Sequence, residues 1–196
     1  MSHGVAMPDH LLTIDEWDAL DVKDDGDRCE LVEGVLVVTP RPGLHHQFAA
    51  YRLVELLNEH LPDELLAVFD VEVAVDERFP ATLRAPDVVV VPTVVYDSAP
   101  KRLSGAEVVV AVEIVSPGTA RTDRVMKFAE YQQAGIEHYW IVDLEADGSR
   151  RFEVYRRVGS SYQRLPVMDG DIVSITEPAA MRFGIGDLTR RRRNAT

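Results

Sequence analysis

The sequence predicts one domain of the α/β (α+β) class, whose central elements follow in the order helix, strand, strand, strand, helix, strand. Its 196 residues match the usual size of a single domain, about 150 residues. Hydrophobic residues make up 46% and charged residues 28%, which is typical of a globular chain with a substantial core. Helical and strand-like apolar patterns alternate along the chain, which sets the order of the elements.

The first element is expected to be a short helix over residues 14–20. Thr13 and Glu16 have the spacing of a capping box, in which each side chain caps the other residue's backbone amide. An acidic loop over residues 23–27 follows it. Residues 29–32 and 35–39 are rich in β-formers and flank Glu33-Gly34, which predicts a hairpin with a tight turn.

The first long helix is expected over residues 44–61. Its apolar residues recur at helical spacing, and Pro62 marks its end. Residues 69–75 then alternate between apolar and acidic side chains, which predicts a strand with one solvated face. A turn-rich stretch to residue 85 and a loop over 92–107 separate this strand from two buried runs, 88–91 and 108–115, which are typical of central strands.

The second half of the chain contains a helix and several further strands. A helix is predicted over residues 121–134, with Gly135 as its left-handed cap. A strand is expected over 138–143, a hairpin from 152–157 and 162–166, and an edge strand over 171–176. The chain closes on a basic run, residues 190–193, which is expected to form a tail.

Composition narrows the possible partners and the compartment. The net charge of −12 excludes non-specific nucleic-acid binding through a globally basic surface, so a phosphate partner must meet a local patch. The apolar runs are far shorter than the roughly 20 residues that cross a bilayer, so no membrane contact is expected. A single cysteine, Cys29, allows no internal disulfide, and the N-terminus lacks a signal-peptide pattern, so the expected location is the cytoplasm.

Glu113 is the most informative residue, because it lies within an otherwise apolar strand. A carboxylate buried there costs several kcal/mol unless it is paired or bound to a metal. Asp87 begins a neighbouring predicted strand, so the two carboxylates can converge at one edge of the sheet and bind Mg²⁺ or Mn²⁺. The alternatives are an arginine partner for Glu113 and a simple turn role for Asp87 after Pro86.

The ordered set of motifs resembles a known family, the Uma-two-type restriction endonucleases of the PD-(D/E)XK nuclease superfamily. The resemblance covers residues 13–157, and the rest of the single domain 1–196 adds C-terminal strands and the basic tail. It implies a restriction-endonuclease-like αβββαβ core with a mixed central sheet flanked by helices. The motifs are Glu30-Leu-Val-Glu-Gly34, His46-Gln47, Pro86-Asp-Val-Val-Val-Val91, Val112-Glu-Ile-Val-Ser-Pro117, Asp123 with Lys127 and Tyr131, and Ala134-Gly-Ile-Glu-His-Tyr-Trp-Ile-Val-Asp143.

The chain departs from the superfamily pattern at Val115, where a lysine is expected two residues after Glu113. The resemblance implies that Lys127, on the following helix, takes the place of that lysine at the reacting phosphate. The alternative is a solvated lysine paired with Asp123, and a helical rotation of about 100° per residue favours that alternative.

The resemblance also implies roles for Glu30 and His46. Glu30 would bind a metal or order a water, and its alternative is an exposed strand residue. His46 would assist proton transfer beside the metal. Its alternative, shared with His45, is a surface position on the helix.

These observations predict one function and leave one alternative open. The first is a Mg-dependent endonuclease that hydrolyses phosphodiester bonds of DNA, with Asp87 and Glu113 as metal ligands. The second is a catalytically silent nuclease fold used as a binding or regulatory module, which the absent strand lysine and the acidic charge favour. A homodimer would place two sites across a duplex. The hairpin residues 35–38 and 152–155, with Tyr139 and Trp140, would supply its interface or else cover the sheet within one chain.

Overall fold

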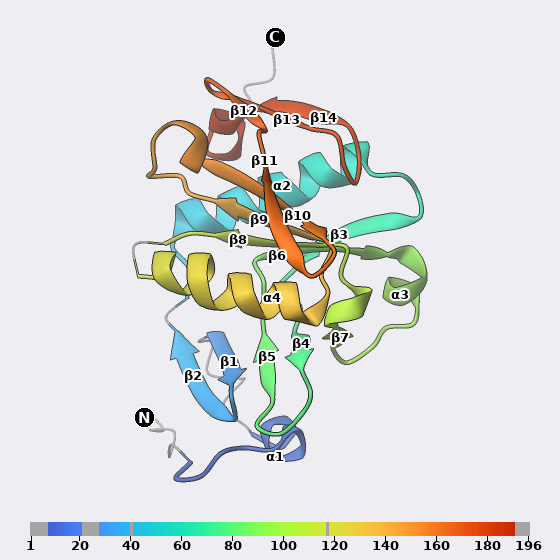
Figure 1. Ribbon diagram of the computed structural model, residues 1–196, viewed down its shortest axis with the longest axis vertical. Helices are drawn as coiled ribbons and strands as arrows, with labels where there is room; N and C mark the ends of the chain where they lie inside the picture. The colour runs from blue at the N-terminus through green and yellow to red at the C-terminus, as the bar shows by residue number, and fades with distance from the viewer. Residues whose placement is uncertain (1–7, 21–27, 40, 117, 191–196) are drawn as a thin grey trace.

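A six-stranded mixed sheet forms the centre of the molecule in the computed structural model, which describes residues 8–20, 28–39, 41–116 and 118–190 (Figure 1). All neighbouring strands are antiparallel except β8 and β9, which are parallel. The order across the sheet is β11 (Ser161–Leu165), β10 (Phe152–Val158), β9 (His138–Val142), β8 (Val110–Ile114), β6 (Val88–Pro92) and β3 (Leu65–Phe69).

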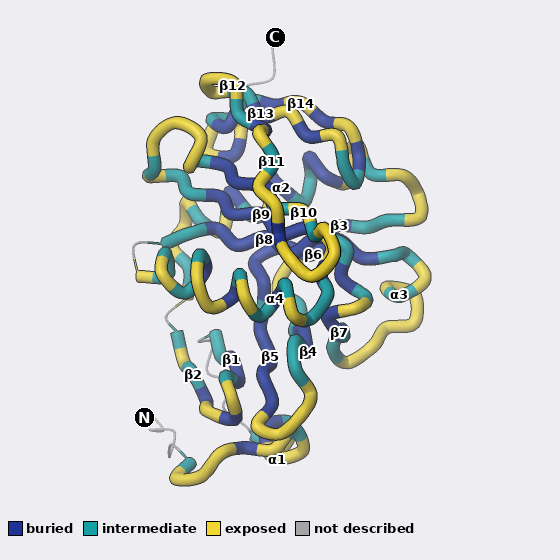
Figure 2. The backbone as a smooth tube through the Cα atoms, in the orientation of Figure 1, coloured by how far each residue is buried: buried dark blue, intermediate teal, exposed yellow. Residues whose placement is uncertain are grey.

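Two helices cover opposite faces of this sheet, as Figure 1 shows: α2 (Leu44–His60) and α4 (Phe128–Ala134). Alternate residues of a strand point to opposite faces. In β6, Val88 and Val90 pack in the cluster that contains Leu53 of α2, whereas Val89 packs in the cluster that contains Tyr131 of α4. The apolar runs of the sequence are therefore buried on both sides, and the central strands are the most continuously buried part of the chain (Figure 2).

A second sheet packs below the first in Figure 1 and contributes part of the site. Its order is β2 (Val35–Thr39), β1 (Arg28–Val32), β5 (Thr82–Arg84), β4 (Val73–Asp76) and β7 (Leu103–Ser104). Helix α1 (Ile14–Asp18) closes its core through Trp17, which packs in one cluster with Leu31 and Leu83. A third sheet, β12 (Met168–Asp169), β13 (Ile172–Ile175) and β14 (Met181–Gly184), shares the core of α2.

Predictions based on local sequence signals were the most reliable. The capping box of Thr13 and Glu16 is present, although α1 ends at Asp18. Glu33 and Gly34 have φ values of 49° and 77°, so the first hairpin turns through two left-handed residues as expected. Gly135 ends α4 with φ of 87°. The order helix, strand, strand, strand, helix, strand is confirmed as α2, β3, β6, β8, α4 and β9.

Some boundaries were predicted wrongly. The expected strand over 69–75 instead contains the last residue of β3, a turn at Asp70, which adopts a φ of 59°, and the start of β4. The turn-rich stretch contains β5, and the loop over 92–107 contains α3 (Thr93–Asp97) and β7. Residues 171–176 form β13, which is the middle strand of the third sheet rather than an edge.

Two further features concern the chain as a whole. None of the helices in the described ranges has the length and apolar character needed to cross a membrane. The expected acidic loop over 23–27 and all but the first residue of the basic run 190–193 lie outside the described residues.

Candidate active site

Asp87 and Glu113 lie side by side at one end of the central sheet. Val88 of β6 pairs with Val112 of β8 in antiparallel register, so the next opposed residues are Asp87 and Glu113. Side chains opposed in this way have their Cβ atoms about 5 Å apart. Oδ2 of Asp87 also accepts a hydrogen bond of 2.7 Å from the backbone amide of Ile114. The expected convergence of the two carboxylates is therefore present, with exposures of 7% and 2%.

Positive groups surround the Asp87 carboxylate. Arg28, at the start of β1, forms an ion pair with Oδ1, and Nε2 of His46 lies 3.1 Å from Oδ2. Burial raises the pKa of Asp87, but its bonds with His46, Arg28 and the Ile114 amide lower the pKa more, so it stays below the usual range. Burial lowers the pKa of His46, and the hydrogen bond and charge of Asp87 more than reverse this.

Glu113 contacts two residues of the helical segment after β8. Nζ of Lys127 lies 2.9 Å from Oε1, and the hydroxyl of Tyr131 donates a 2.6 Å hydrogen bond to the same oxygen. Burial is the main reason that the pKa of Glu113 is raised, and the charge of Lys127 only partly offsets it. Burial alone would lower the pKa of Lys127, but the charges of Glu113, Glu30 and Asp123 raise it, so Lys127 stays a cation.

Glu30 belongs to the same buried network. Its Oε1 lies 3.3 Å from Nζ of Lys127 and accepts a bond from the backbone amide of Ala85. Its Oε2 accepts a 2.9 Å bond from Arg84, which also binds Glu130 of α4 through two nitrogens. Burial raises the pKa of Glu30, whereas the charges of Lys127 and Arg84 lower it below its ordinary value. Glu30 is therefore a buried link between β1 of the second sheet and Lys127, on the helical segment after β8.

A π-helix over Thr122–Lys127 explains how Lys127 reaches the site. A π-helix closes its hydrogen bonds over five residues, so it rotates less per residue than an α-helix. Asp123 and Lys127 face inward and are buried, whereas the apolar residues Val125 and Met126 are exposed. Lys127 still lies 3.8 Å from Asp123, but within the site and not on a solvated face.

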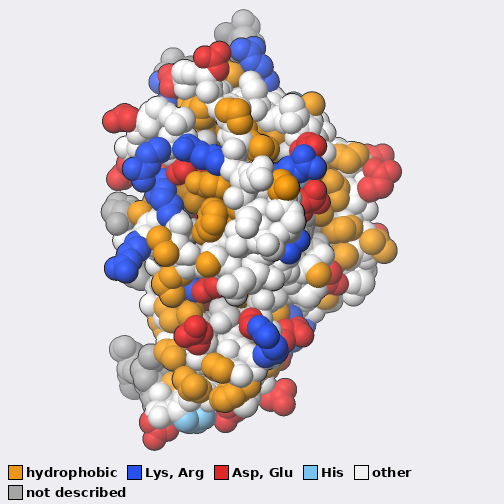
Figure 3. All heavy atoms as spheres, viewed as in Figure 1, with side chains coloured by type: hydrophobic (Ala, Val, Ile, Leu, Met, Phe, Trp, Pro, Cys, Tyr) orange, Lys and Arg blue, Asp and Glu red, His pale blue; other side chains and the backbone are white. Residues whose placement is uncertain are grey.

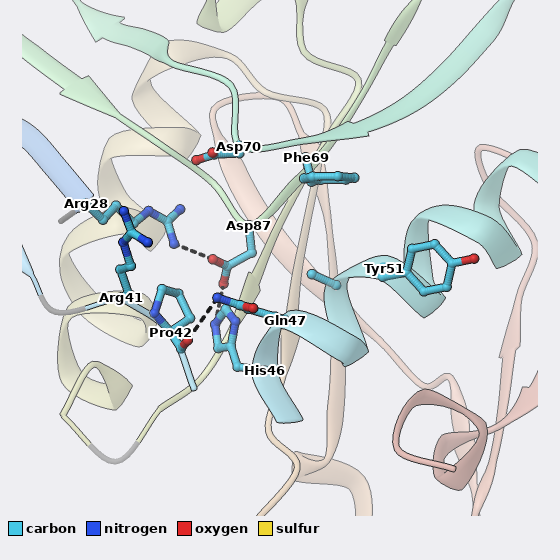
Figure 4. A pocket seen from close by; sticks show the side chains of 10 residues that line it. Arg28, Arg41, Pro42, His46, Gln47, Tyr51, Phe69, Asp70 and Asp87 are labelled. Carbon is cyan, nitrogen blue, oxygen red and sulfur yellow. Dashed lines mark hydrogen bonds and ion pairs between the residues drawn. The ribbon is translucent and has the colours of Figure 1, made fainter. Parts of the chain in front are cut away.

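An open cleft of about 470 Å³ leads to this network from the side of Asp87 (Figure 4). Residues from β1, the start of α2 and the end of β3 surround Asp87. Glu113 and Lys127 do not line this cleft. Of the two neighbouring carboxylates, Asp87 is therefore the one that faces the cleft. The lining residues are Arg28, Arg41, Pro42, His46, Gln47, Ala50, Tyr51, Phe69, Asp70 and Asp87.

The structure brings all five sequence-derived candidates into two connected groups. His46 contacts Asp87, and Lys127 joins Glu113 to Glu30, while His45 is exposed on α2. Sequence reasoning missed four residues: Arg28 and Arg84 have partners distant along the chain, and the other two line the cleft. Only Arg84 had a local signal, because it is a basic residue directly before the Ala85-Pro86-Asp87 segment. The missed residues are Arg28, Arg41, Asp70 and Arg84.

The donor set fits a divalent cation of the magnesium type. Within the described ranges, no cluster of three or more His, Cys, Asp or Glu side chains has the arrangement of a closed metal cage. Mg²⁺ does not require one, because it is usually held by one or two carboxylates together with waters and substrate phosphates. Asp87 and Glu113 would supply the two carboxylates, and the cleft beside Asp87 would leave room for the remaining ligands.

A mixed sheet with a helix on each face, and two carboxylates and a lysine at one end of its central strands, define a restriction-endonuclease-like fold. The family model described as "Uma2: Putative restriction endonuclease" matches residues 14–185, so the chain belongs to the Uma2 family. The curated proteins searched contain no match.

A solved structure shows the same fold. It is described as a "putative nuclease belonging to DUF820" from Anabaena variabilis, and its TM-score is 0.68 at 19% sequence identity. The match covers 91% of this chain and 97% of that chain. The predicted fold class and family are therefore confirmed.

Proposed function

We propose that the chain is a Mg²⁺- or Mn²⁺-dependent endonuclease that hydrolyses phosphodiester bonds of DNA. The observation that carries this proposal is the 2.9 Å contact between Lys127 and Glu113, beside Asp87. This contact supports the proposal because a buried ammonium lies next to two carboxylates, although the strand itself has Val115 where the superfamily pattern has lysine. The family description and the fold of the solved neighbour support the same reaction class.

Asp87 and Glu113 would hold the metal, since both lie at the same end of neighbouring strands and are acceptor-only groups once ionised. A bound divalent cation lowers the pKa of a coordinated water and neutralises charge on the leaving oxygen. The low pKa of Asp87 keeps that carboxylate ionised at neutral pH and ready to bind.

Lys127 would stabilise charge on the transferred phosphate. Its raised pKa keeps the ammonium protonated, so it can donate to a phosphate oxygen without first gaining a proton. Glu30 and Asp123 orient it, because they lie within 3.3 and 3.8 Å of Nζ. His46, next to Asp87 and on the cleft, would exchange a proton with the attacking water once its own proton is lost.

The test is cleavage of supercoiled plasmid DNA with Mg²⁺ or Mn²⁺, with and without excess EDTA. We expect nicking or linearisation that EDTA abolishes and that Glu113→Gln removes. Glu145→Gln is the matched control, because Glu145 is an exposed carboxylate outside the site. Cleavage that persists in EDTA, or that Glu113→Gln leaves unchanged, would show that these residues are not a metal-dependent nuclease site.

A second function, a catalytically silent binding or regulatory module, has its own support. Both oxygens of Asp87 already bind protein donors, Arg28 on one and His46 with the Ile114 amide on the other. These three donors leave one acceptor site of the carboxylate, on Oδ1, for a metal. Positive and negative side chains are also mixed on the face seen in Figure 3, so that face is not a uniform DNA-binding surface. Calorimetric titration with Mn²⁺ separates the two functions, because only the nuclease requires an ion at Asp87 and Glu113.

We also propose that residues 1–196 act as one nuclease-like domain in the cytoplasm and that two copies form a homodimer. Part of the expected interface is not at the surface: Tyr139, Trp140 and Phe152 are buried within the chain, where they cover the central sheet. Val35 and Val38 are exposed on the edge strand β2 and remain candidates for the contact. Light scattering tests the dimer, since a mass of 21.9 kDa at all concentrations would contradict it.

A further inference from the structure

The cleft beside Asp87 has two chemically different walls. In Figure 4, Arg28 and Arg41 lie on one side of Asp87, and the rings of Phe69 and Tyr51 lie on the other. Both rings are large apolar groups left exposed, at 56% for Phe69 and 55% for Tyr51. Nothing in the proposed hydrolysis uses these rings, so they need a separate explanation.

The fold itself fixes the two rings beside the acidic residue. Phe69 is the last residue of β3 and pairs in register with Val88, the neighbour of Asp87. Tyr51 lies on α2 five residues after His46, on the part of the helix that lines the cleft. Each ring is thus carried by a regular element and does not depend on a loop.

The opposite wall is suited to an anion. Arg28 bonds Asp87 through Nη1, but its Nε and Nη2 atoms are buried and have no hydrogen-bond partner among the residues that the structure describes. Arg41 adds a second guanidinium to the same wall. Two acidic residues, Asp70 and Asp87, also line the cleft. A divalent cation bound to Asp87 would offset this negative charge and favour binding of a phosphate in the cleft.

We propose that this cleft binds an unpaired nucleotide of single-stranded DNA, with its phosphate on Arg28 and Arg41 and its base against Phe69 and Tyr51. The proposal rests on the proposed nuclease function and names its substrate class. Exposed aromatic rings beside a positive groove are the usual means of holding single strands, because every unpaired base offers a flat face. The bases of a duplex are stacked on each other and present no such face. A volume of about 470 Å³ is also that of a small-molecule site.

The test is equilibrium binding by fluorescence anisotropy in Ca²⁺, with a labelled single-stranded oligonucleotide and a blunt hairpin of related sequence. We expect tighter binding of the single strand by about tenfold or more. Phe69→Ala and Tyr51→Ala should each weaken single-strand binding by roughly 5- to 150-fold, the usual effect of losing one stacking partner. Phe69→Leu should behave like Phe69→Ala, and Phe69→Tyr should keep the affinity.

Phe79→Ala and Tyr96→Ala are matched controls, because these rings are also exposed but do not line the cleft. Equal affinity for strand and hairpin, or equal losses in the control variants, would overturn the proposal. Plasmid and single-strand cleavage by the same proteins separates it from the nuclease function. If the duplex is cut but the aromatic variants bind the strand normally, only the substrate class falls. If the strand binds as expected and nothing is cut, the substrate class stands and the nuclease function falls.

Discussion

Nζ of Lys127 lies 2.9 Å from Oε1 of Glu113, although the two residues belong to different elements of the fold. Glu113 is on β8, and Lys127 ends the π-helical turn that returns over the same face of the sheet. The helix therefore supplies the cation that the strand lacks after Glu113. Because both groups are buried, their interaction is only weakly screened by solvent.

Replacement of Lys127 by alanine should reduce turnover by about 10²- to 10³-fold, the usual cost of one charge-stabilising donor. Divalent-ion affinity should change little, because the proposed ligands are Asp87 and Glu113. Lys127→Arg should restore little activity, since a planar guanidinium does not fit a site built around an ammonium. Steady-state cleavage assays and calorimetry measure the two effects. Lys101→Ala is the exposed control, and full activity of Lys127→Ala would contradict the role.

Substitution of Asp87 or Glu113 should weaken metal binding as well as cleavage, unlike substitution of Lys127. Asp87→Asn and Glu113→Gln keep the shape of the side chains but lose the charge that a hard cation needs. Each should weaken Mn²⁺ affinity by at least about tenfold and abolish cleavage. Glu113→Gln should remain folded, because Lys127 keeps Glu30 and Asp123 as partners. Titration calorimetry with circular dichroism checks both points, and Asp169→Asn, an exposed change on β12, should leave them unaltered.

Arg84 should be important for stability and not for chemistry. It is 2% exposed and joins Glu30 of β1 to Glu130 of α4. Arg84→Met removes one partner of a buried ion pair, which typically costs about 3–5 kcal/mol of unfolding free energy. Urea denaturation measures this loss. Arg78→Met is the control, because Arg78 also binds a carboxylate, Asp76, but in an exposed pair, and it should cause no measurable change.

The sequence predicted those parts of the fold that depend on local chemistry. Thr13 with Glu16, Glu33 with Gly34, and Gly135 each specify a cap or turn within a few residues, and the structure has all three. Asp70 shows where this failed: the alternation of 69–75 continues across a residue that the structure holds at a positive φ. Asp70 is exposed, aspartate tolerates a positive φ better than most residues, and no nearby glycine or proline marked the turn.

The site could be predicted where one residue contradicts its surroundings. Glu113 is a carboxylate in an apolar strand, and that conflict pointed to the candidate site from sequence alone. Lys127 was harder, because a rotation of about 100° per residue assumes an α-helix, and this segment is a π-helix. Arg28 gave no local signal at all, since its partner Asp87 lies 59 residues away.

His138 should make folding stability depend on pH independently of the active site. Its ring is buried in β9, Nδ1 has no hydrogen-bond partner within the described part of the chain, and Glu137 is 3.6 Å from Nε2. Burial therefore lowers the pKa of His138 below its ordinary value of 6.5. Between these two pKa values the unfolded chain binds a proton that the folded chain does not, so stability is complete above about pH 6.5 and falls as the pH decreases.

Urea denaturation from pH 8 to pH 5 should show this loss in the wild-type protein, beyond any loss in His138→Leu, which cannot be protonated there. His45→Gln, an exposed change on α2, should follow the wild-type profile, and parallel pH profiles for the wild type and His138→Leu would show that the buried imidazole does not cause the loss.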